Sequence, residues 1–162
     1  MVIKMEAVKT VSFTDVSAQT PITVTFVCTG NTCRSPMAAA VLNHLGKGRY
    51  KALSAGISAV TGDPISINSV LALKKAGIPC TPENNYERHR ALQICEEIVE
   101  RSDKVIAISK SHMMALIYAF PKYAEKITVM PRDIPDPFMY DEAVYESCLE
   151  SITECIKESF LL

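Results

Sequence analysis

A cysteine and an arginine lie six positions apart near the start of this chain, in a segment suited to binding and attacking a phosphoryl group. Residues 27–36 read VCTGNTCRSP, which gives Cys28 and Arg34 the Cys-x5-Arg spacing. Backbone N–H groups of a tight loop before a helix attract an oxyanion, and the same positive potential stabilises a cysteine thiolate. A guanidinium can hold two phosphoryl oxygens at once. The pattern therefore predicts phosphoryl transfer to Cys28.

The residues around this segment favour a strand, a turn and a helix in that order. Residues 22–27 alternate and are rich in β-formers. Gly30 gives the backbone freedom for a sharp turn. Ser35 is expected to cap the helix that continues over residues 37–45, and Pro36 suits its first turn. The spacing alone is weak evidence, but this context argues against an ordinary buried cysteine beside a turn.

The whole segment resembles the phosphate-binding loop of low-molecular-weight protein tyrosine phosphatases and their relatives. In that family the loop follows the first strand, as it does here, and an Asp-Pro-aromatic triplet lies late in the chain. The triplet Asp136-Pro137-Phe138 matches that feature. The resemblance covers about residues 22–162. It implies a four-stranded parallel sheet in the order 2-1-3-4.

The expected reaction has two steps that share one carboxylate. Cys28 attacks phosphorus to form a phosphocysteine while Asp136 protonates the leaving group, and Asp136 then activates water to hydrolyse the intermediate. Asp133 is the alternative acid, and Phe138 is expected to form a wall of the pocket. Arg34 and the loop amides stabilise the equatorial oxygens. The residues expected to bind phosphate are Thr29, Gly30, Asn31, Thr32, Cys33, Arg34 and Ser35.

Four residues are predicted to support the nucleophile. Ser35 can donate a hydrogen bond to the Cys28 sulfur and stabilise it as a leaving group. The resemblance implies that Asn31 is tied to a serine, for which Ser54 is the candidate; the alternative is a plain turn serine. Cys33 is predicted to form a reversible disulfide with Cys28 under oxidants, the alternative being a small buried filler.

Composition narrows the possible partners. The chain has 162 residues, a net charge of −1 and 48% hydrophobic residues, which predicts one globular domain without affinity for nucleic acid or an anionic membrane. We find no run of transmembrane length and no secretory signal, so a cytoplasmic monomer acting on phosphorylated protein is expected. Neither a cofactor nor a metal is expected, because no His or Cys cluster completes four ligands. The three histidines His44, His89 and His112 are interpreted as structural or surface residues.

Periodicity predicts an α/β fold in which a four-stranded parallel sheet carries helices on both faces. Residues 22–162 are predicted to form the phosphatase domain, and residues 1–21 an extension that is either disordered or holds a short extra strand near residues 3–7. The predicted strands cover residues 22–27, 50–53, 104–109 and 127–130. The predicted helices cover residues 37–45, 64–76, 91–101 and 111–120, with a last helix from Asp141. The cysteines predicted to lie on buried helix stripes are Cys95, Cys148 and Cys155.

Two protein phosphatase activities remain open within the family. In the branch directed to phosphotyrosine, the position of Thr32 is commonly isoleucine and that of Thr29 is often leucine. The loop of the protein arginine phosphatases resembles this one throughout. A small polar Thr32 suits a planar guanidinium phosphate better than a phenyl ring, so phosphoarginine is favoured over phosphotyrosine.

The third possibility is a thioredoxin-coupled arsenate reductase, because arsenate mimics phosphate. Those enzymes need two further cysteines near the end of the third strand, and residues 105–112 contain none. The loop also continues with Pro36, where reductases tend to differ. A reductase is therefore the least favoured of the three alternatives.

Overall fold

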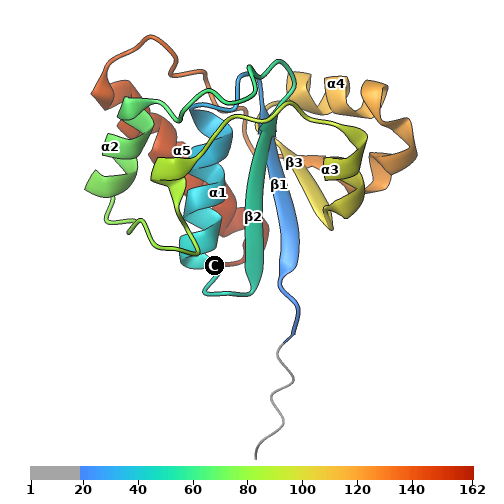
Figure 1. Ribbon diagram of the computed structural model, residues 1–162, viewed down its shortest axis with the longest axis horizontal. Helices are drawn as coiled ribbons and strands as arrows, with labels where there is room; N and C mark the ends of the chain where they lie inside the picture. Colours follow the sequence, from blue (N-terminus) through green and yellow to red (C-terminus); the bar gives the residue numbers. More distant parts are fainter. Residues whose placement is uncertain (1–18) are drawn as a thin grey trace, which may run out of the picture.

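Four parallel strands form one sheet in the order β2-β1-β3-β4, as predicted (Figure 1). The computed structural model describes residues 19–162, so the extra strand considered near residues 3–7 lies outside the described residues. The strands are β1 (Ile22–Cys28), β2 (Tyr50–Gly56), β3 (Lys104–Ala107) and β4 (Ile127–Val129). Because β1 is central, its last five residues are buried, and Cys28 lies at its carboxyl end.

Helices cover both faces of the sheet (Figure 1). Their bounds are α1 (Arg34–Leu45), α2 (Ile67–Lys75), α3 (Glu96–Arg101), α4 (Lys110–Ala119) and α5 (Glu142–Phe160), with 3₁₀ turns η1 (Tyr86–Arg88) and η2 (Pro121–Lys126). No helix within residues 19–162 is both long and apolar enough to cross a membrane.

Alternation along β1 divides the core into two clusters. Phe26 packs with the residues of α1 and α5 on one face of the sheet, including Leu42 and Ile152. The next residue, Val27, packs with Leu116 of α4 on the other face. Successive side chains of a strand point to opposite faces, so the central strand anchors both layers and fixes the position of the loop that follows it.

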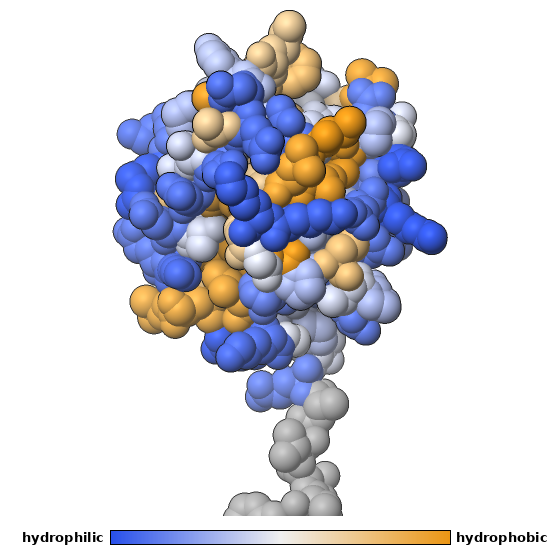
Figure 2. Space-filling view, turned by 90° about the vertical axis from the view of Figure 1, so that its left-hand side faces the viewer, coloured by the Kyte–Doolittle hydropathy of each residue, from blue (hydrophilic) through white to orange (hydrophobic). Residues whose placement is uncertain are grey.

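The side of the molecule that carries α2 has apolar side chains among a mainly hydrophilic surface (Figure 2). Ile67 and Leu71 of α2 are exposed, whereas Leu73 is fully buried. At the end of this helix, the Lys75 ammonium pairs with the Glu146 carboxylate of α5 at 2.6 Å. α2 is therefore held against α5 beside the loop that enters α1.

The predicted helix over residues 91–101 is wrong in its first half. Within this range only residues 96–101, which form α3, are helical. The residues before them form hydrogen bonds with β2 instead. The Leu92 carbonyl accepts from the Gly56 amide at 2.9 Å, and the Gly56 carbonyl accepts from the Ile94 amide at 2.8 Å. Cys95 is consequently exposed at the start of α3 and is not a core residue, contrary to the prediction. Cys148 and Cys155 are buried, as predicted.

The predicted role of Ser35 as a helix cap is also wrong. α1 begins one residue earlier, at Arg34, and has no side-chain cap. The Ser35 hydroxyl points instead into the loop, where it contacts Cys28 and Asn31. Ser35 is therefore a residue of the site rather than of the helix end.

Candidate active site

The loop between β1 and α1 turns its carbonyl groups outward. The carbonyls of Cys28, Thr29 and Thr32 accept hydrogen bonds from backbone N–H groups of segment 57–66 at 2.9, 3.0 and 2.9 Å. Within residues 19–162, no backbone amide of residues 29–34 donates to another protein group. These amides and the N-terminus of α1 therefore form a cradle of unused donors, which is an oxyanion-binding arrangement.

Asn31 fixes the shape of this loop from inside. It is fully buried and has a positive φ of 58°, a conformation that asparagine tolerates better than most residues. Its Nδ2 donates to Ser35 Oγ at 2.8 Å and to Ser54 Oγ at 2.9 Å, and its Oδ1 accepts from the Leu92 amide at 2.9 Å. The contact predicted between Asn31 and Ser54 is thus present.

Gly56 at the end of β2 and His89 after η1 also hold the loop in place. A Cβ at Gly56 would lie 2.4 Å from the Thr29 carbonyl oxygen, so this close approach requires glycine. The half-buried His89 lies with its Nε2 2.7 Å from the Asn31 carbonyl oxygen, to which it must donate. Burial lowers the pKa of His89 despite this hydrogen bond. His89 therefore supports the loop as a neutral imidazole.

The candidate nucleophile lies at the base of the cradle. Cys28 is 2% exposed, and its Sγ lies 2.9 Å from Ser35 Oγ. Asn31 donates to Ser35 Oγ, so the Ser35 proton can go to the Cys28 sulfur at 2.9 Å or to the Ala55 carbonyl at the longer distance of 3.4 Å. A hydroxyl that donates to sulfur stabilises negative charge on it, both before attack and when it leaves.

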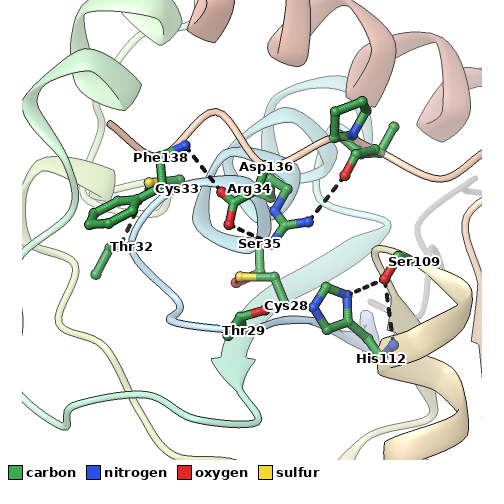
Figure 3. Close-up of polar contacts among 12 residues, drawn as sticks. Cys28, Thr29, Thr32, Cys33, Arg34, Ser35, Ser109, His112, Asp136 and Phe138 are labelled. Atoms are coloured by element: carbon green, nitrogen blue, oxygen red, sulfur yellow. Dashed lines mark hydrogen bonds and ion pairs between the residues drawn. The ribbon is translucent and has the colours of Figure 1, made fainter. Parts of the chain in front are cut away.

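The loop after β4 places the Asp136 carboxylate beside the Arg34 guanidinium (Figure 3). Arg34 donates from Nη1 to the Ile134 carbonyl at 3.1 Å, and its Nη2 lies 3.3 Å from Asp136 Oδ2. The Asp136 side chain is 51% exposed, and its other oxygen accepts from the Phe138 amide at 3.1 Å. The buried guanidinium thus connects the phosphate loop to the loop that carries the candidate acid.

The other candidate acid lies away from this pocket. Asp133 Oδ1 accepts from the backbone amide of Lys110 at 2.9 Å, at the start of α4. A carboxylate at that position stabilises the helix N-terminus. Of the two candidates, only Asp136 lines the pocket.

The cradle forms the floor of a pocket of about 250 Å³. Its floor consists of residues 28–34, and Phe138 and Asp136 form one side, as predicted. Ser58, Val60 and Asp63 from the segment after β2 form the other side. These three residues were not predicted, because neither their types nor their spacing belongs to a motif.

A second histidine contacts the phosphate loop directly. His112 of α4 is buried, and its Nε2 lies 2.9 Å from Thr29 Oγ1. Its Nδ1 lies 2.7 Å from Ser109 Oγ (Figure 3). Burial lowers the pKa of His112, and the positive charge of Arg34 lowers it further. The position of His112 shortly after β3 could have predicted this contact. The carboxyl ends of the neighbouring parallel strands β1 and β3 lie at the same edge of the sheet, so the residues that follow them are close in space.

The second loop cysteine faces the helical layer. Cys33 Sγ lies 3.2 Å from the Tyr145 hydroxyl of α5. Burial, together with this hydrogen bond, raises the pKa of Tyr145 to about 12. Burial also raises the pKa of the nearby Cys148 thiol to about 12. All six cysteines are free thiols, and no three metal-ligating side chains cluster within residues 19–162.

Sequence comparison agrees with this geometry. The family model for low molecular weight phosphotyrosine protein phosphatase matches residues 23–160. A protein-arginine-phosphatase of Geobacillus stearothermophilus is 32% identical over 143 residues, which cover 84% of this chain and 92% of that protein.

Solved structures share the fold as well. A low molecular weight protein tyrosine phosphatase from T. tengcongensis is 35% identical and superposes with a TM-score of 0.79, covering 86% of this chain and 98% of that one. A cysteine-to-serine variant of the YwlE arginine phosphatase, with a phosphorylated active-site serine, is 27% identical with a TM-score of 0.75, covering 85% and 93%. The family match over most of the sequence, together with the strand order and the loop between β1 and α1, shows that this chain belongs to the low molecular weight phosphotyrosine protein phosphatase family.

Proposed function

We propose that this protein hydrolyses phosphoarginine in proteins through a phosphocysteine intermediate at Cys28. The observation that carries the proposal is the cradle itself: Cys28 lies beneath unused backbone amides, with Arg34 and Asp136 at its rim. A thiolate in that position faces a phosphoryl group whose oxygens are bound by the amides and the guanidinium.

In the first step the Cys28 sulfur forms a bond to phosphorus and the P–N bond to the arginine side chain breaks. Asp136 donates a proton to the departing guanidine nitrogen. A phosphoryl dianion on Arg34 takes the place of the Asp136 carboxylate, and its negative charge favours a proton on the displaced carboxyl. The ion pair at 3.3 Å is therefore a contact that substrate would replace.

In the second step water attacks phosphorus and the S–P bond breaks. Asp136 takes the proton from water, and inorganic phosphate leaves. The Ser35 hydroxyl, 2.9 Å from Cys28 Sγ, stabilises the sulfur as it leaves. In the related arginine phosphatase, a serine in place of the cysteine carries the phosphoryl group, which supports the same attachment point here.

Two observations favour phosphoarginine as the substrate. Thr32 lines the pocket, and a threonine hydroxyl can pair with guanidinium N–H groups. The curated relative from Geobacillus stearothermophilus is a protein-arginine-phosphatase. Phosphotyrosine is the second candidate, because Phe138 can stack on an aryl ring and the T. tengcongensis neighbour is a tyrosine phosphatase.

The site gives little support to an arsenate reductase. That reaction needs a relay of thiols, and the segment after β3 carries Ser109 and His112 rather than cysteine. The proposed phosphatase chemistry needs a reduced Cys28, which fits a reducing compartment such as the cytoplasm. Phosphorylated protein is then the partner, and catalysis needs no cofactor.

The test is side-by-side turnover of two peptides of identical sequence that carry phosphoarginine or phosphotyrosine at one position. Released inorganic phosphate is measured at neutral pH. A higher kcat/KM for phosphoarginine is expected. A higher value for phosphotyrosine would assign the chain to the tyrosine-directed activity, and no phosphate release from either peptide would refute the phosphatase proposal.

A further inference from the structure

His112 bridges two hydroxyl groups at the edge of the pocket. The imidazole is 4% exposed and lies in the first turn of α4. Its Nε2 contacts Thr29 Oγ1 at 2.9 Å and its Nδ1 contacts Ser109 Oγ at 2.7 Å (Figure 3). Thr29 follows Cys28 directly and lines the pocket. The bridge therefore runs from the phosphate loop after β1 to the helix after β3.

The direction of this bridge depends on which way the hydrogen bond between Ser111 and Ser109 runs. Ser109 Oγ accepts from the His112 backbone amide as the cap of α4, and it lies 2.9 Å from Ser111 Oγ. If the exposed Ser111 donates to Ser109, the single Ser109 proton goes to Nδ1 of His112. A neutral imidazole that accepts at Nδ1 carries its proton at Nε2 and donates it to Thr29 Oγ1.

This direction leaves the Thr29 proton without a partner among the groups around it. No other side-chain or backbone acceptor within residues 19–162 bonds to Thr29 Oγ1. Thr29 is one of the residues that line the pocket, where a phosphoryl group bound to the cradle presents oxygens. A hydroxyl that accepts a hydrogen bond from an imidazole and donates one to a charged oxygen is a well-oriented donor.

We propose that His112 is a positioning residue that orients the Thr29 hydroxyl as an additional hydrogen-bond donor to the bound phosphoryl group. This inference rests on the proposed phosphatase function. The same turn of α4 also holds the second loop of the site, because the Lys110 amide donates to Asp133 Oδ1 at 2.9 Å, three residues before Asp136. The first turn of α4 therefore contacts both loops of the site, through His112 and through the Lys110 amide.

The test compares variants of His112 that keep or remove the donor. His112→Gln places an amide N–H near the position of Nε2, and His112→Leu removes it. A charge-assisted hydrogen bond lost from the transition state lowers kcat/KM by about tenfold to a hundredfold, and this loss is expected for His112→Leu. His112→Gln should recover most of that loss. The exposed His44→Gln is the matched control and should match the parent.

A double-mutant cycle with Thr29→Val shows whether the effect passes through the hydroxyl. If it does, His112→Leu adds little to a protein that already carries Thr29→Val, and Thr29→Ser stays close to the parent. Additive losses, or a Gln variant no better than the Leu variant, would overturn the inference. If His112→Leu does not fold, Thr29→Val breaks the same bridge from the loop side and must show the same loss.

A spectroscopic measurement tests the direction of the bridge independently of turnover. The ¹⁵N shifts of the His112 ring should identify the neutral tautomer with its proton at Nε2. A proton at Nδ1 would overturn the proposed orientation, even in an active enzyme. A parent that hydrolyses neither phosphopeptide refutes the phosphatase proposal instead, whereas an active parent with an unaffected His112→Leu variant refutes only the role of His112.

Discussion

Arg34 and Asp136 form an ion pair at the rim of the pocket, with Nη2 3.3 Å from Oδ2. The guanidinium is nearly buried while the carboxylate is about half exposed, so the arginine is the fixed partner and the aspartate the replaceable one. A phosphoryl group needs the same guanidinium edge. In the proposed mechanism the pair links phosphate binding to release of the candidate acid, and mutation can separate the two effects.

Asp136→Asn should slow hydrolysis of substrates with poor leaving groups by about 10²–10⁴, the usual contribution of general acid catalysis. Activated aryl phosphates should be slowed less. Inorganic phosphate should bind up to about fivefold tighter as a competitive inhibitor, because exposed ion pairs contribute up to about 1 kcal/mol and this one no longer competes. Asp133→Asn is the control; if that variant shows the leaving-group dependence instead, the acid is Asp133.

Cys28→Ser should abolish turnover and leave phosphate binding largely intact. Serine keeps the shape of the side chain, but its hydroxyl is hardly ionised at neutral pH. Hydrolysis of an aryl phosphate and phosphate binding by NMR would measure the two properties separately. The control is Cys95→Ser, which changes an exposed thiol outside the pocket. Turnover of Cys28→Ser within tenfold of the parent would exclude Cys28 as the nucleophile.

Mild peroxide should inactivate the protein reversibly through a bond between Cys28 and Cys33. Peroxide converts the Cys28 thiolate to a sulfenic acid, and the Cys33 thiol then displaces water to form the disulfide. Mass spectrometry should show the loop crosslinked, and a thiol reductant should restore activity. Cys33→Ser should lose this recovery while Cys95→Ser keeps it; equal recovery in both variants would leave Cys33 without a redox role.

The half-buried His89 and the buried His112 predict that stability falls in mild acid. Burial is the main cause of the lowered pKa of His89 and of His112, so both bind protons more weakly in the folded than in the unfolded chain. Unfolding free energy should be unaffected by these groups above their ordinary pKa of 6.5 and should decrease as the pH falls below it. Urea unfolding at several pH values between 7.5 and 5 measures this slope.

Substitution of each histidine tests whether it causes the dependence of unfolding free energy on pH. His89→Gln and His112→Gln should each lower the dependence of unfolding free energy on pH, whatever they do to stability at neutral pH. The exposed His44→Gln is expected to keep the parent slope. If His89→Gln and His112→Gln both keep the pH dependence of the parent, other groups cause the loss of unfolding free energy in acid.

The alternation of strands and helices could be predicted from local signals, whereas the strand order was implied by the resemblance to the phosphatase family. The β-rich run before Cys28 and the Ala-rich run after Pro36 each favour one structure, and both match the fold. Asp136 was chosen as the candidate acid because the triplet with Pro137 and Phe138 resembles the family feature, and it lines the pocket. Loop and acid then meet because both follow strands of one parallel sheet.

The errors arise where tertiary contacts override local patterns. Leu92 lies at helical spacing from Cys95, yet its carbonyl and amide bond to Gly56 and to Asn31, so the helix cannot start there. The histidines were missed for the same reason. His89 is 58 residues from Asn31 and His112 is 83 residues from Thr29, so only the folded chain brings them together.

Thr32 is the residue most suited to test substrate preference. This residue lines the pocket, its hydroxyl lies 3.6 Å from Cys33 Sγ, and its carbonyl accepts from the Ser66 amide at 2.9 Å. Threonine and isoleucine are both β-branched, so Thr32→Ile should leave the backbone of the loop unchanged. The change replaces a polar contact with apolar bulk and alters little else.

Thr32→Ile should shift the preference from phosphoarginine toward phosphotyrosine. An apolar wall favours an aryl ring and leaves guanidinium N–H groups without a partner, which costs about 1–3 kcal/mol for each buried group. That cost corresponds to a change of about tenfold to a hundredfold in relative kcat/KM. Thr32→Ser keeps the hydroxyl and is the matched control. The matched phosphopeptides measure the ratio in each variant: the parent and Thr32→Ser should favour phosphoarginine, and Thr32→Ile should level or reverse the order. A parent that already prefers phosphotyrosine would refute the arginine-directed proposal, and an unchanged ratio in Thr32→Ile would show that another part of the pocket selects the substrate.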